Sequence, residues 1–169
     1  EKLKKAVMYD LVLLTTVGVK VVLVHGGGPD INKLLDKMDI ESKFVDGLRY
    51  TDEETMEIVQ MVLAGKVNKS LVALLGRLGS KAVGLCGADG QLIKAKVKDE
   101  RLGYVGEITE INPEPILDLL EKGYVPVIST TACDDEGNIY YVVIDGRFAG
   151  KGDGASIYET AYICKMLGM

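Results

Sequence analysis

The feature that most constrains the fold is an apolar run that passes into three consecutive glycines and then into a helix-forming segment. The run Val-Lys-Val-Val-Leu-Val occupies residues 19–24, and His25, the glycines at 26–28 and Pro29 follow it. The apolar run predicts a buried strand, and Pro29 suits the first turn of a helix. Glycine is costly to order, so a cluster at a strand end indicates that another group approaches the backbone closely.

Apolar periodicity predicts an alternation of helices and strands along the rest of the chain. The expected helices lie at 3–18, at 29–38, at 51–79 with a break near Gly65, at 113–122 and at 154–167. The expected strands lie at 19–24, 81–86, 124–129 and 138–144. This alternation predicts an α/β fold in which helices cover both faces of a central, mainly parallel sheet.

Three local patterns refine the expected elements. Thr51 and Glu54 have the T-x-x-E spacing of a capping box, which predicts a helix that begins after Thr51. Residues 91–98 and 103–109 predict an exposed β-hairpin, and Asp-Asp-Glu-Gly-Asn at 134–138 predicts a hairpin turn.

Composition argues against several classes of protein. The net charge is −5 with acidic and basic residues interleaved, so no basic stripe indicates nucleic acid. Cys86, Cys133 and Cys164 are far apart and lack C-x-x-C spacing, which argues against a zinc site or a disulfide framework and favours a reducing compartment. The longest apolar run is too short to span a bilayer, and the sequence shows no signal peptide.

Two features predict a site for a small acidic metabolite. The N–H groups of Gly26, Gly27 and Gly28 at a helix entry favour an anion, helped by the helix dipole. Arg49 offers a bidentate fork for a carboxylate. A carboxylate is already ionised near neutral pH and needs no general base, so His25 is interpreted as a structural residue of the turn. No metal ligands are assigned.

Other reactive side chains are interpreted as structural. Lys66 and Lys69 are expected to be solvated on a helix, and Cys86 to be a small core residue. Lys151, in Gly-Lys-Gly-Asp-Gly, lacks the spacing of a phosphate-binding loop and is expected in a solvated turn.

Five segments, taken in order, resemble the acetylglutamate kinases of the amino-acid kinase superfamily. They are VVLVHGGGPDIN, FVDGLRYTDEETMEIVQMVLAGKVNKSLVALL, KAVGLCGADGQLIKA, LGYVGEITEINPEPILDLLEKGYVPVIS and DDEGN. The resemblance extends from residue 1 to about residue 140. It implies a three-layer α/β/α sandwich with a β-hairpin lid. It also implies phosphorylation of the side-chain carboxylate of N-acetyl-L-glutamate by ATP with Mg²⁺, in arginine biosynthesis.

The resemblance also implies roles for individual residues. Gly27 and Gly28 match backbone donors near the substrate, with Gly26 and Gly27 close to the phosphoryl group. Arg49 matches the arginine that grips the α-carboxylate of the substrate. The hairpin at 91–109 matches the lid over acetylglutamate. Phosphoryl transfer to a carboxylate depends mainly on alignment and on neutral or positive groups around the moving phosphoryl, which agrees with these roles.

Asp145 has two possible matches. A gapless count places it on the aspartate that orients the catalytic lysines of the family. Alternatively, Tyr-Val-Val-Ile-Asp-Gly-Arg at 141–147 resembles a strand near the C-terminus of the family that reads His-Ile-Ile-Asp-Gly-Arg. The family's N-terminal Lys-Gly-Gly strand and most of its nucleotide-binding half have no match. Residues 1–145 are therefore expected to form the acetylglutamate-binding part, and residues 146–169 a divergent or truncated remnant of the nucleotide-binding part.

Two alternatives to a complete kinase follow from these departures. The chain could be a catalytically incomplete module that binds acetylglutamate, or an engineered minimal sandwich with a vestigial site. The resemblance implies a homodimer or higher homo-oligomer, with neither nucleic acid nor membrane as partner. It implies a cytoplasmic protein, or a plastid protein if the source is a photosynthetic eukaryote.

Overall fold

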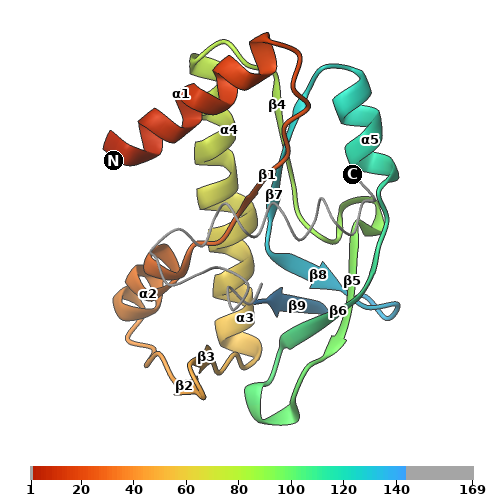
Figure 1. Cartoon of the computed structure of the whole chain (residues 1–169). Helices are drawn as coiled ribbons and strands as arrows, with labels where there is room; N and C mark the ends of the chain where they lie inside the picture. Colours follow the sequence, from red (N-terminus) through yellow and green to blue (C-terminus); the bar gives the residue numbers. More distant parts are fainter. Residues whose placement is uncertain (1, 144–169) are drawn as a thin grey trace.

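The computed structural model of the chain describes residues 2–143 (Figure 1). The helices are α1 (Lys2–Thr16), α2 (Gly28–Lys37), α3 (Glu53–Gln60), α4 (Asn68–Arg77) and α5 (Glu114–Glu121), with a π-helical segment η1 (Met61–Val67) between α3 and α4 and 3₁₀ turns η2 (Asp89–Gln91) and η3 (Glu100–Leu102). The strands are β1 (Leu23–His25), β2 (Phe44–Val45), β3 (Leu48–Arg49), β4 (Ala82–Leu85), β5 (Ile93–Val97), β6 (Val105–Ile111), β7 (Val125–Ser129), β8 (Thr131–Cys133) and β9 (Ile139–Val142). The helix expected at 154–167 and Asp145 lie outside the described residues.

A parallel sheet in the order β1-β7-β4 forms the centre of the molecule. Helices α1 and α4 pack on one face of the sheet and α5 on the other (Figure 1). The predicted α/β sandwich with a central parallel sheet is therefore confirmed. The strand expected at 19–24 is shorter and later than predicted, because β1 contains only residues 23–25.

Alternation along residues 21–24, which lead into β1, explains why the sheet needs helices on both sides. Val21 and Leu23 pack into the cluster formed with α1 and α4, whereas Val22 and Val24 pack into the cluster that includes Ile116 of α5. Burying one such aliphatic side chain contributes roughly 1.5–3 kcal/mol. A strand with apolar residues on both faces is stable only between two layers.

Four further strands close into a barrel in the order β5-β6-β9-β8, and β2 and β3 pair separately (Figure 1). β5 and β6 form the expected antiparallel hairpin, and β8 and β9 flank the expected turn at 134–138. The hairpin is exposed on one face only: Lys96 and Glu107 are largely exposed, whereas Ala95 and Val105 face the core and are 4% and 0% exposed. β8 and the closure of the barrel were not predicted.

Residues 53–77 form one continuous helical rod, so the break expected near Gly65 is wrong. The chain widens into the π-helical segment η1 there instead of ending. By length and composition this 25-residue helix could cross a membrane. Its buried side chains, however, belong to two core clusters: Met56 and Val59 pack against α2, and Leu71 and Leu75 pack on the sheet.

The first turn of α3 corrects the predicted capping box. Asp52 is the N-cap, and its carboxylate accepts a hydrogen bond of 2.9 Å from the N–H of Thr55. Thr51 lies one residue before the cap, where its backbone N–H donates to the carbonyl of Leu102 and its own carbonyl accepts from the N–H of Tyr104. The bonds to Thr55 hold the pKa of Asp52 below its ordinary value.

Replacing Asp52 with alanine is expected to destabilise the fold by about 1 kcal/mol, the usual cost of a lost N-cap. Replacing Glu54, the residue of the predicted capping box, should change stability by less than about 0.5 kcal/mol. Urea denaturation of both variants measures the difference. A larger loss of stability on replacing Glu54 than on replacing Asp52 would support the predicted capping box instead.

Candidate functional site

The carboxyl ends of the three parallel strands meet at one edge of the sheet. His25 of β1 lies opposite Ser129 of β7, and Leu85 of β4 lies opposite Ile128. The glycine turn at 26–28 follows β1 directly at this edge. In sheets of this type, ligands bind in the crevice beyond the carboxyl ends of the strands.

Packing requires glycine at only one of the three positions 26–28. A Cβ on Gly27 would lie 2.8 Å from Cδ2 of Leu63 and 3.2 Å from Cγ2 of Val67. The close approach predicted from the sequence is thus confirmed at Gly27, but η1 is the group that approaches. No described atom lies within 4 Å of a Cβ built on Gly26 or Gly28. Packing against residues 2–143 therefore does not explain these two glycines.

The glycine turn leads directly into α2. Gly27 is the N-cap, Gly28 is the first helical residue, and Pro29 lies in the first turn as predicted. The first N–H groups of a helix have no partner within the helix and carry the positive end of its dipole. Asp30 shares this first turn, but an ion pair of 2.8 Å with Lys66 offsets its charge and holds its pKa below the ordinary value.

Arg49 is buried, with 5% of its surface exposed. Its guanidinium donates to the hydroxyl of Ser42 at 3.1 Å and to Oδ1 of Asn32. The carbon Cζ lies 4.9 Å from the centroid of the Phe44 ring. Burial lowers the pKa of Arg49, yet an arginine remains protonated at physiological pH. Within residues 2–143, no carboxylate forms an ion pair with this cation.

The bond to Asn32 connects Arg49 to the N-terminal half of α2, the half that begins at the glycine turn. Asn32 lies four residues after Gly28, about 6 Å along a helix axis. The structure therefore brings together two of the features singled out in the sequence, a helix N-terminus and a buried cation. No pattern in the sequence singled out Asn32 or Ser42, which are polar residues in ordinary surroundings.

A buried amide behind the glycine turn was also missed. Asn68 is 0% exposed, and its Nδ2 lies 3.1 Å from Nε2 of His25, 2.9 Å from the carbonyl of Val127 and 3.3 Å from the carbonyl of Leu85. Nδ1 of His25 lies 3.0 Å from the carbonyl of Gly26. These contacts agree with the structural interpretation of His25. A polar residue inside an otherwise apolar helical run was the available signal for Asn68.

His25 makes stability depend on pH. Burial lowers its pKa below the ordinary 6.5, and Lys4 of α1 and Lys69 of α4 lower it further, while the bond to Gly26 opposes these effects. As the pH falls below about 6.5, His25 binds a proton in the unfolded state but not in the folded state, so the free energy of unfolding falls. We expect a slope of up to about 1.4 kcal/mol per pH unit between pH 6.5 and the folded pKa.

Urea denaturation between pH 7.5 and 5 measures this slope. The control is His25→Gln, because His25 is the only histidine of the sequence. The variant should lose the slope above the range where carboxylates titrate. An equal slope in the variant would assign the effect to other groups.

The remaining candidates have ordinary surroundings. Lys66 is largely exposed as expected, although it pairs with Asp30, and Lys69 bonds to Oδ1 of Asn68 and to the carbonyl of Gly84. Cys86 is partly buried, and burial raises its pKa. Over the described part of the chain, no three His, Cys, Asp or Glu side chains are grouped to hold a metal ion.

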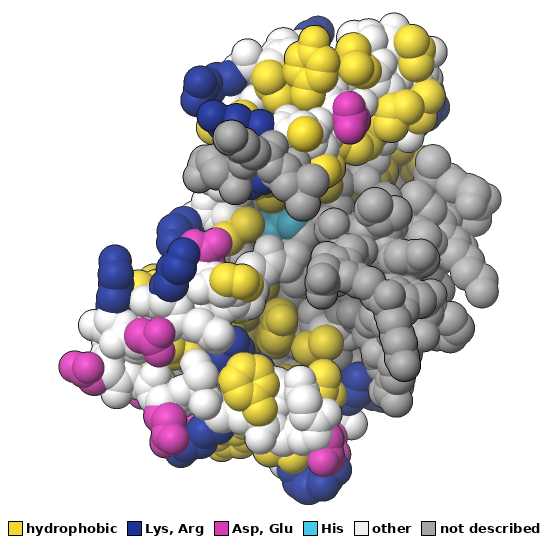
Figure 2. Space-filling view, turned by 60° about the vertical axis from the view of Figure 1, so that its left-hand side comes forward, with side chains coloured by type: hydrophobic (Ala, Val, Ile, Leu, Met, Phe, Trp, Pro, Cys, Tyr) yellow, Lys and Arg dark blue, Asp and Glu magenta, His cyan; other side chains and the backbone are white. Residues whose placement is uncertain are grey.

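The space-filling view places this site on a face of mixed character. Figure 2 shows only a small part of the histidine surface, as expected for a residue that is 6% exposed. Hydrophobic side chains gather above it over α1 (Figure 2). The exposed apolar side chains of α1 are Val7, Tyr9, Leu13 and Leu14.

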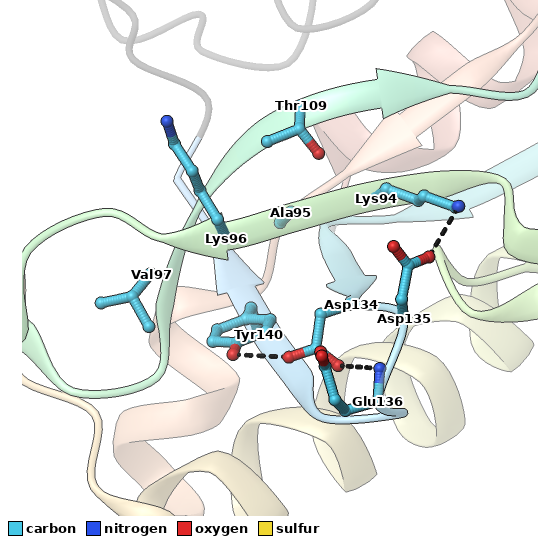
Figure 3. A pocket seen from close by; sticks show the side chains of 9 residues that line it. All are labelled: Lys94, Ala95, Lys96, Val97, Thr109, Asp134, Asp135, Glu136 and Tyr140. Carbon is cyan, nitrogen blue, oxygen red and sulfur yellow. Dashed lines mark hydrogen bonds and ion pairs between the residues drawn. The ribbon is translucent and has the colours of Figure 1, made fainter.

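A separate polar cavity of about 290 Å³ lies on the barrel between the β5–β6 hairpin and the turn at 134–138 (Figure 3). Three of its charged groups have partners: Lys94 contacts Asp135 at 2.7 Å, and the hydroxyl of Tyr140 donates to Asp134 at 2.8 Å. Desolvation and the neighbouring Asp134 raise the pKa of Tyr140 to about 12. These two contacts, drawn in Figure 3, connect β5 and β9 to the turn at 134–138.

The sheet and the glycine turn are those of the amino acid kinase family, whose sequence model matches residues 1–157. The chain belongs to this family. A solved structure of a protein from Streptococcus mutans UA159 superimposes with a TM-score of 0.76 at 29% identity, over 80% of this chain and 56% of that one.

The curated relatives are named acetylglutamate kinase. The enzyme of Clostridium kluyveri is 56% identical over 147 residues, which cover 86% of this chain and 52% of that protein. The enzyme of Clostridioides difficile is 58% identical over 141 residues, covering 83% and 49%. The chain thus spans about half the length of the relatives it matches. The resemblance stated from the sequence is confirmed.

Proposed function

We propose that this chain forms the N-acetyl-L-glutamate-binding part of an acetylglutamate kinase. The observation that carries the proposal is Arg49, a buried guanidinium that lacks an ion-paired carboxylate within residues 2–143. A buried charge is costly unless it is paired, so a carboxylate ligand explains why an arginine stands here. The names of the relatives agree with such a ligand.

The two ends of the site suit the two carboxylates of the ligand. Arg49 would hold the α-carboxylate, with guanidinium N–H groups beyond those used by Asn32 and Ser42. The side-chain carboxylate would then point to Gly26, Gly27 and Gly28, where helix N–H groups favour an anion. Because Gly26 and Gly28 are open on the side a Cβ would occupy, the reacting group can approach the backbone.

In the complete protein the reaction would be phosphorylation of that carboxylate. The bond between the γ-phosphorus and the bridging oxygen of ATP breaks, a bond from a carboxylate oxygen to phosphorus forms, and ADP leaves. The glycine N–H groups would stabilise charge on the moving phosphoryl group. The described residues offer no carboxylate cluster for Mg²⁺, so we assign no step of this chain to the metal.

Isothermal titration calorimetry of the chain with N-acetyl-L-glutamate tests the binding. N-acetyl-L-glutamine is the matched control ligand, because it keeps the α-carboxylate and replaces only the side-chain carboxylate by an amide. We expect binding of the first and clearly weaker binding of the second. Absence of heat with N-acetyl-L-glutamate at millimolar concentration would overturn the proposal.

Kinase activity is tested in a separate experiment on the full-length product of the gene. Incubation with ATP, Mg²⁺, N-acetyl-L-glutamate and hydroxylamine should trap the acyl phosphate as a hydroxamate. Binding by the chain without hydroxamate from the full-length product would favour the alternative, a binding module that does not transfer phosphate. The half-length coverage of the relatives is the observation behind this alternative.

A further inference from the structure

The amide of Asn68 joins the ends of three strands at the edge of the sheet that carries the glycine turn. Its Nδ2 contacts the carbonyl of Val127 in β7 and the carbonyl of Leu85 in β4, and Oδ1 accepts from Nζ of Lys69 at 3.0 Å. Carbonyl oxygens only accept and an ammonium only donates, so these partners fix which end of the amide is the nitrogen. The third contact of Nδ2, at 3.1 Å, is to Nε2 of His25 of β1. The amide has two hydrogens for these three acceptors, so the longest contact, to Leu85 at 3.3 Å, shares a hydrogen with another.

This orientation determines the tautomer of His25. Nδ2 of Asn68 is a donor, so Nε2 of His25 must be the acceptor, and the imidazole proton of the neutral ring must lie on Nδ1. Nδ1–H then donates to the carbonyl of Gly26. The opposite tautomer would set one N–H against another at Asn68 and a lone pair against a carbonyl at Gly26. Burial lowers the pKa of His25, which keeps the ring neutral.

The bond from His25 to the carbonyl of Gly26 also orients the N–H of Gly27, a candidate ligand donor, because both groups belong to one peptide. The carbonyl of Gly26 and the N–H of Gly27 belong to the same planar peptide and point in opposite directions when it is trans. The described peptides are all trans. Holding the carbonyl toward His25 therefore directs the N–H of Gly27 away from it.

The same helical rod holds the turn at a second point. Leu63 and Val67 of η1 pack against Gly27, and Asn68 is the next residue along the rod. A side chain at position 84 would overlap the amide of Asn68, so glycine there makes room for it. The backbone next to Asn68 therefore packs against Gly27, and its side chain packs against Gly84.

We propose that Asn68 is a positioning residue, which fixes the Nδ1–H tautomer of His25 and through it the direction of the Gly27 N–H. The proposal rests on the proposed function for the role of that N–H in ligand binding. The tautomer and the peptide orientation can be measured without any ligand.

The first experiment is a ¹H–¹⁵N spectrum of the imidazole ring at pH 7.5. His25 is the only histidine, so its signals need no assignment. We expect a protonated Nδ1 and a bare Nε2. A protonated Nε2 in the unmodified chain would overturn the proposal at once.

Two substitutions and a control test the role of the amide. Asn68→Leu removes the donor, and Asn68→Asp replaces it with an acceptor of the same shape, so the aspartate should draw the proton to Nε2. Asn112→Leu is the control, because Asn112 bonds to Gly90 and Glu114 beside α5. We expect the imidazole spectrum and the amide shift of Gly27 to change in both Asn68 variants and not in the control. Unchanged spectra in a folded Asn68→Asp chain would overturn the proposal.

Calorimetry with N-acetyl-L-glutamate then separates this proposal from the proposed function. A loss of about tenfold in affinity for Asn68→Asp, with Asn112→Leu unchanged, supports both. If the unmodified chain binds no acetylglutamate, the proposed function fails, while the tautomer and the Gly27 shift still decide the positioning role. If the spectra change but affinity does not, Asn68 orients the peptide without serving the ligand, and the positioning role in binding is wrong.

Discussion

Replacing Arg49 with methionine is expected to weaken binding of N-acetyl-L-glutamate by at least about 30-fold, or about 2 kcal/mol. The reason is that Arg49 is 5% exposed, so water cannot substitute for the guanidinium when the carboxylate is held beside it. Methionine retains much of the aliphatic packing and removes the charge and the hydrogen-bond fork. Calorimetry of the variant, with circular dichroism to verify the fold, measures the effect.

Two further variants make this prediction specific. Arg49→Lys keeps the charge without the planar fork and should bind more weakly than the unmodified chain but more tightly than Arg49→Met. Arg101→Met is the matched control, because Arg101 is exposed and already paired with Asp99 at 2.7 Å. Equal affinity of the Arg49 and Arg101 variants for N-acetyl-L-glutamate would show that Arg49 does not bind this ligand.

Replacing Gly27 with alanine is expected to destabilise the fold by about 1–3 kcal/mol, the usual cost of overpacking a core. The new Cβ would lie 2.8 Å from Leu63, which is fully buried and has no free space to move into. Gly28→Ala is the matched comparison, since no described atom lies within 4 Å of its Cβ. Urea denaturation should therefore separate the two variants.

Ligand affinity should separate them in a second way. The methyl group of Gly28→Ala should leave stability unchanged or slightly higher, because alanine suits a helix better than glycine. It should nevertheless weaken binding of N-acetyl-L-glutamate, because it fills the open side next to the helix N–H groups. Similar losses of stability in both variants, or full affinity in Gly28→Ala, would contradict this division of roles.

The sequence predicted the elements whose signals are local. The apolar runs at 81–86 and 124–129 became β4 and β7, and the helix at 113–122 became α5, which ends before Gly123 with a positive φ of 75°. Gly27 and Gly28 could be singled out because a glycine cluster at a strand end is unusual, and Arg49 because its guanidinium suits a carboxylate and matches an arginine of the family that the sequence resembles. Their roles in ligand binding remain predictions.

The parts that the sequence did not predict depend on partners far away in the chain. β8 has only three residues and exists because it pairs with β5 and β9. Thr51 has the residue type of an N-cap, but its backbone is bonded to Leu102 and Tyr104, and Asp52 takes the role. Asn68 is explained by its contacts to His25, Leu85 and Val127, which lie on three different strands or their ends. No local pattern contains these pairings.

The π-helical segment has a consequence for how this chain tolerates changes in length. Each residue of an α-helix advances the direction of the side chains by about 100°. The rod from Glu53 to Arg77 has to present Val59 to one core cluster and Leu75 to another, and the wide turn at 61–67 sets the angle between these two faces. A π-helical turn contains one residue more than an α-helical turn, so deleting one residue there would restore regular winding and leave both faces directed at their clusters. Deleting one residue from α4 instead would turn the side chains that follow it by about 100° and take them off the sheet. The π-helical segment is therefore the part of this helix that best tolerates a gap of one residue.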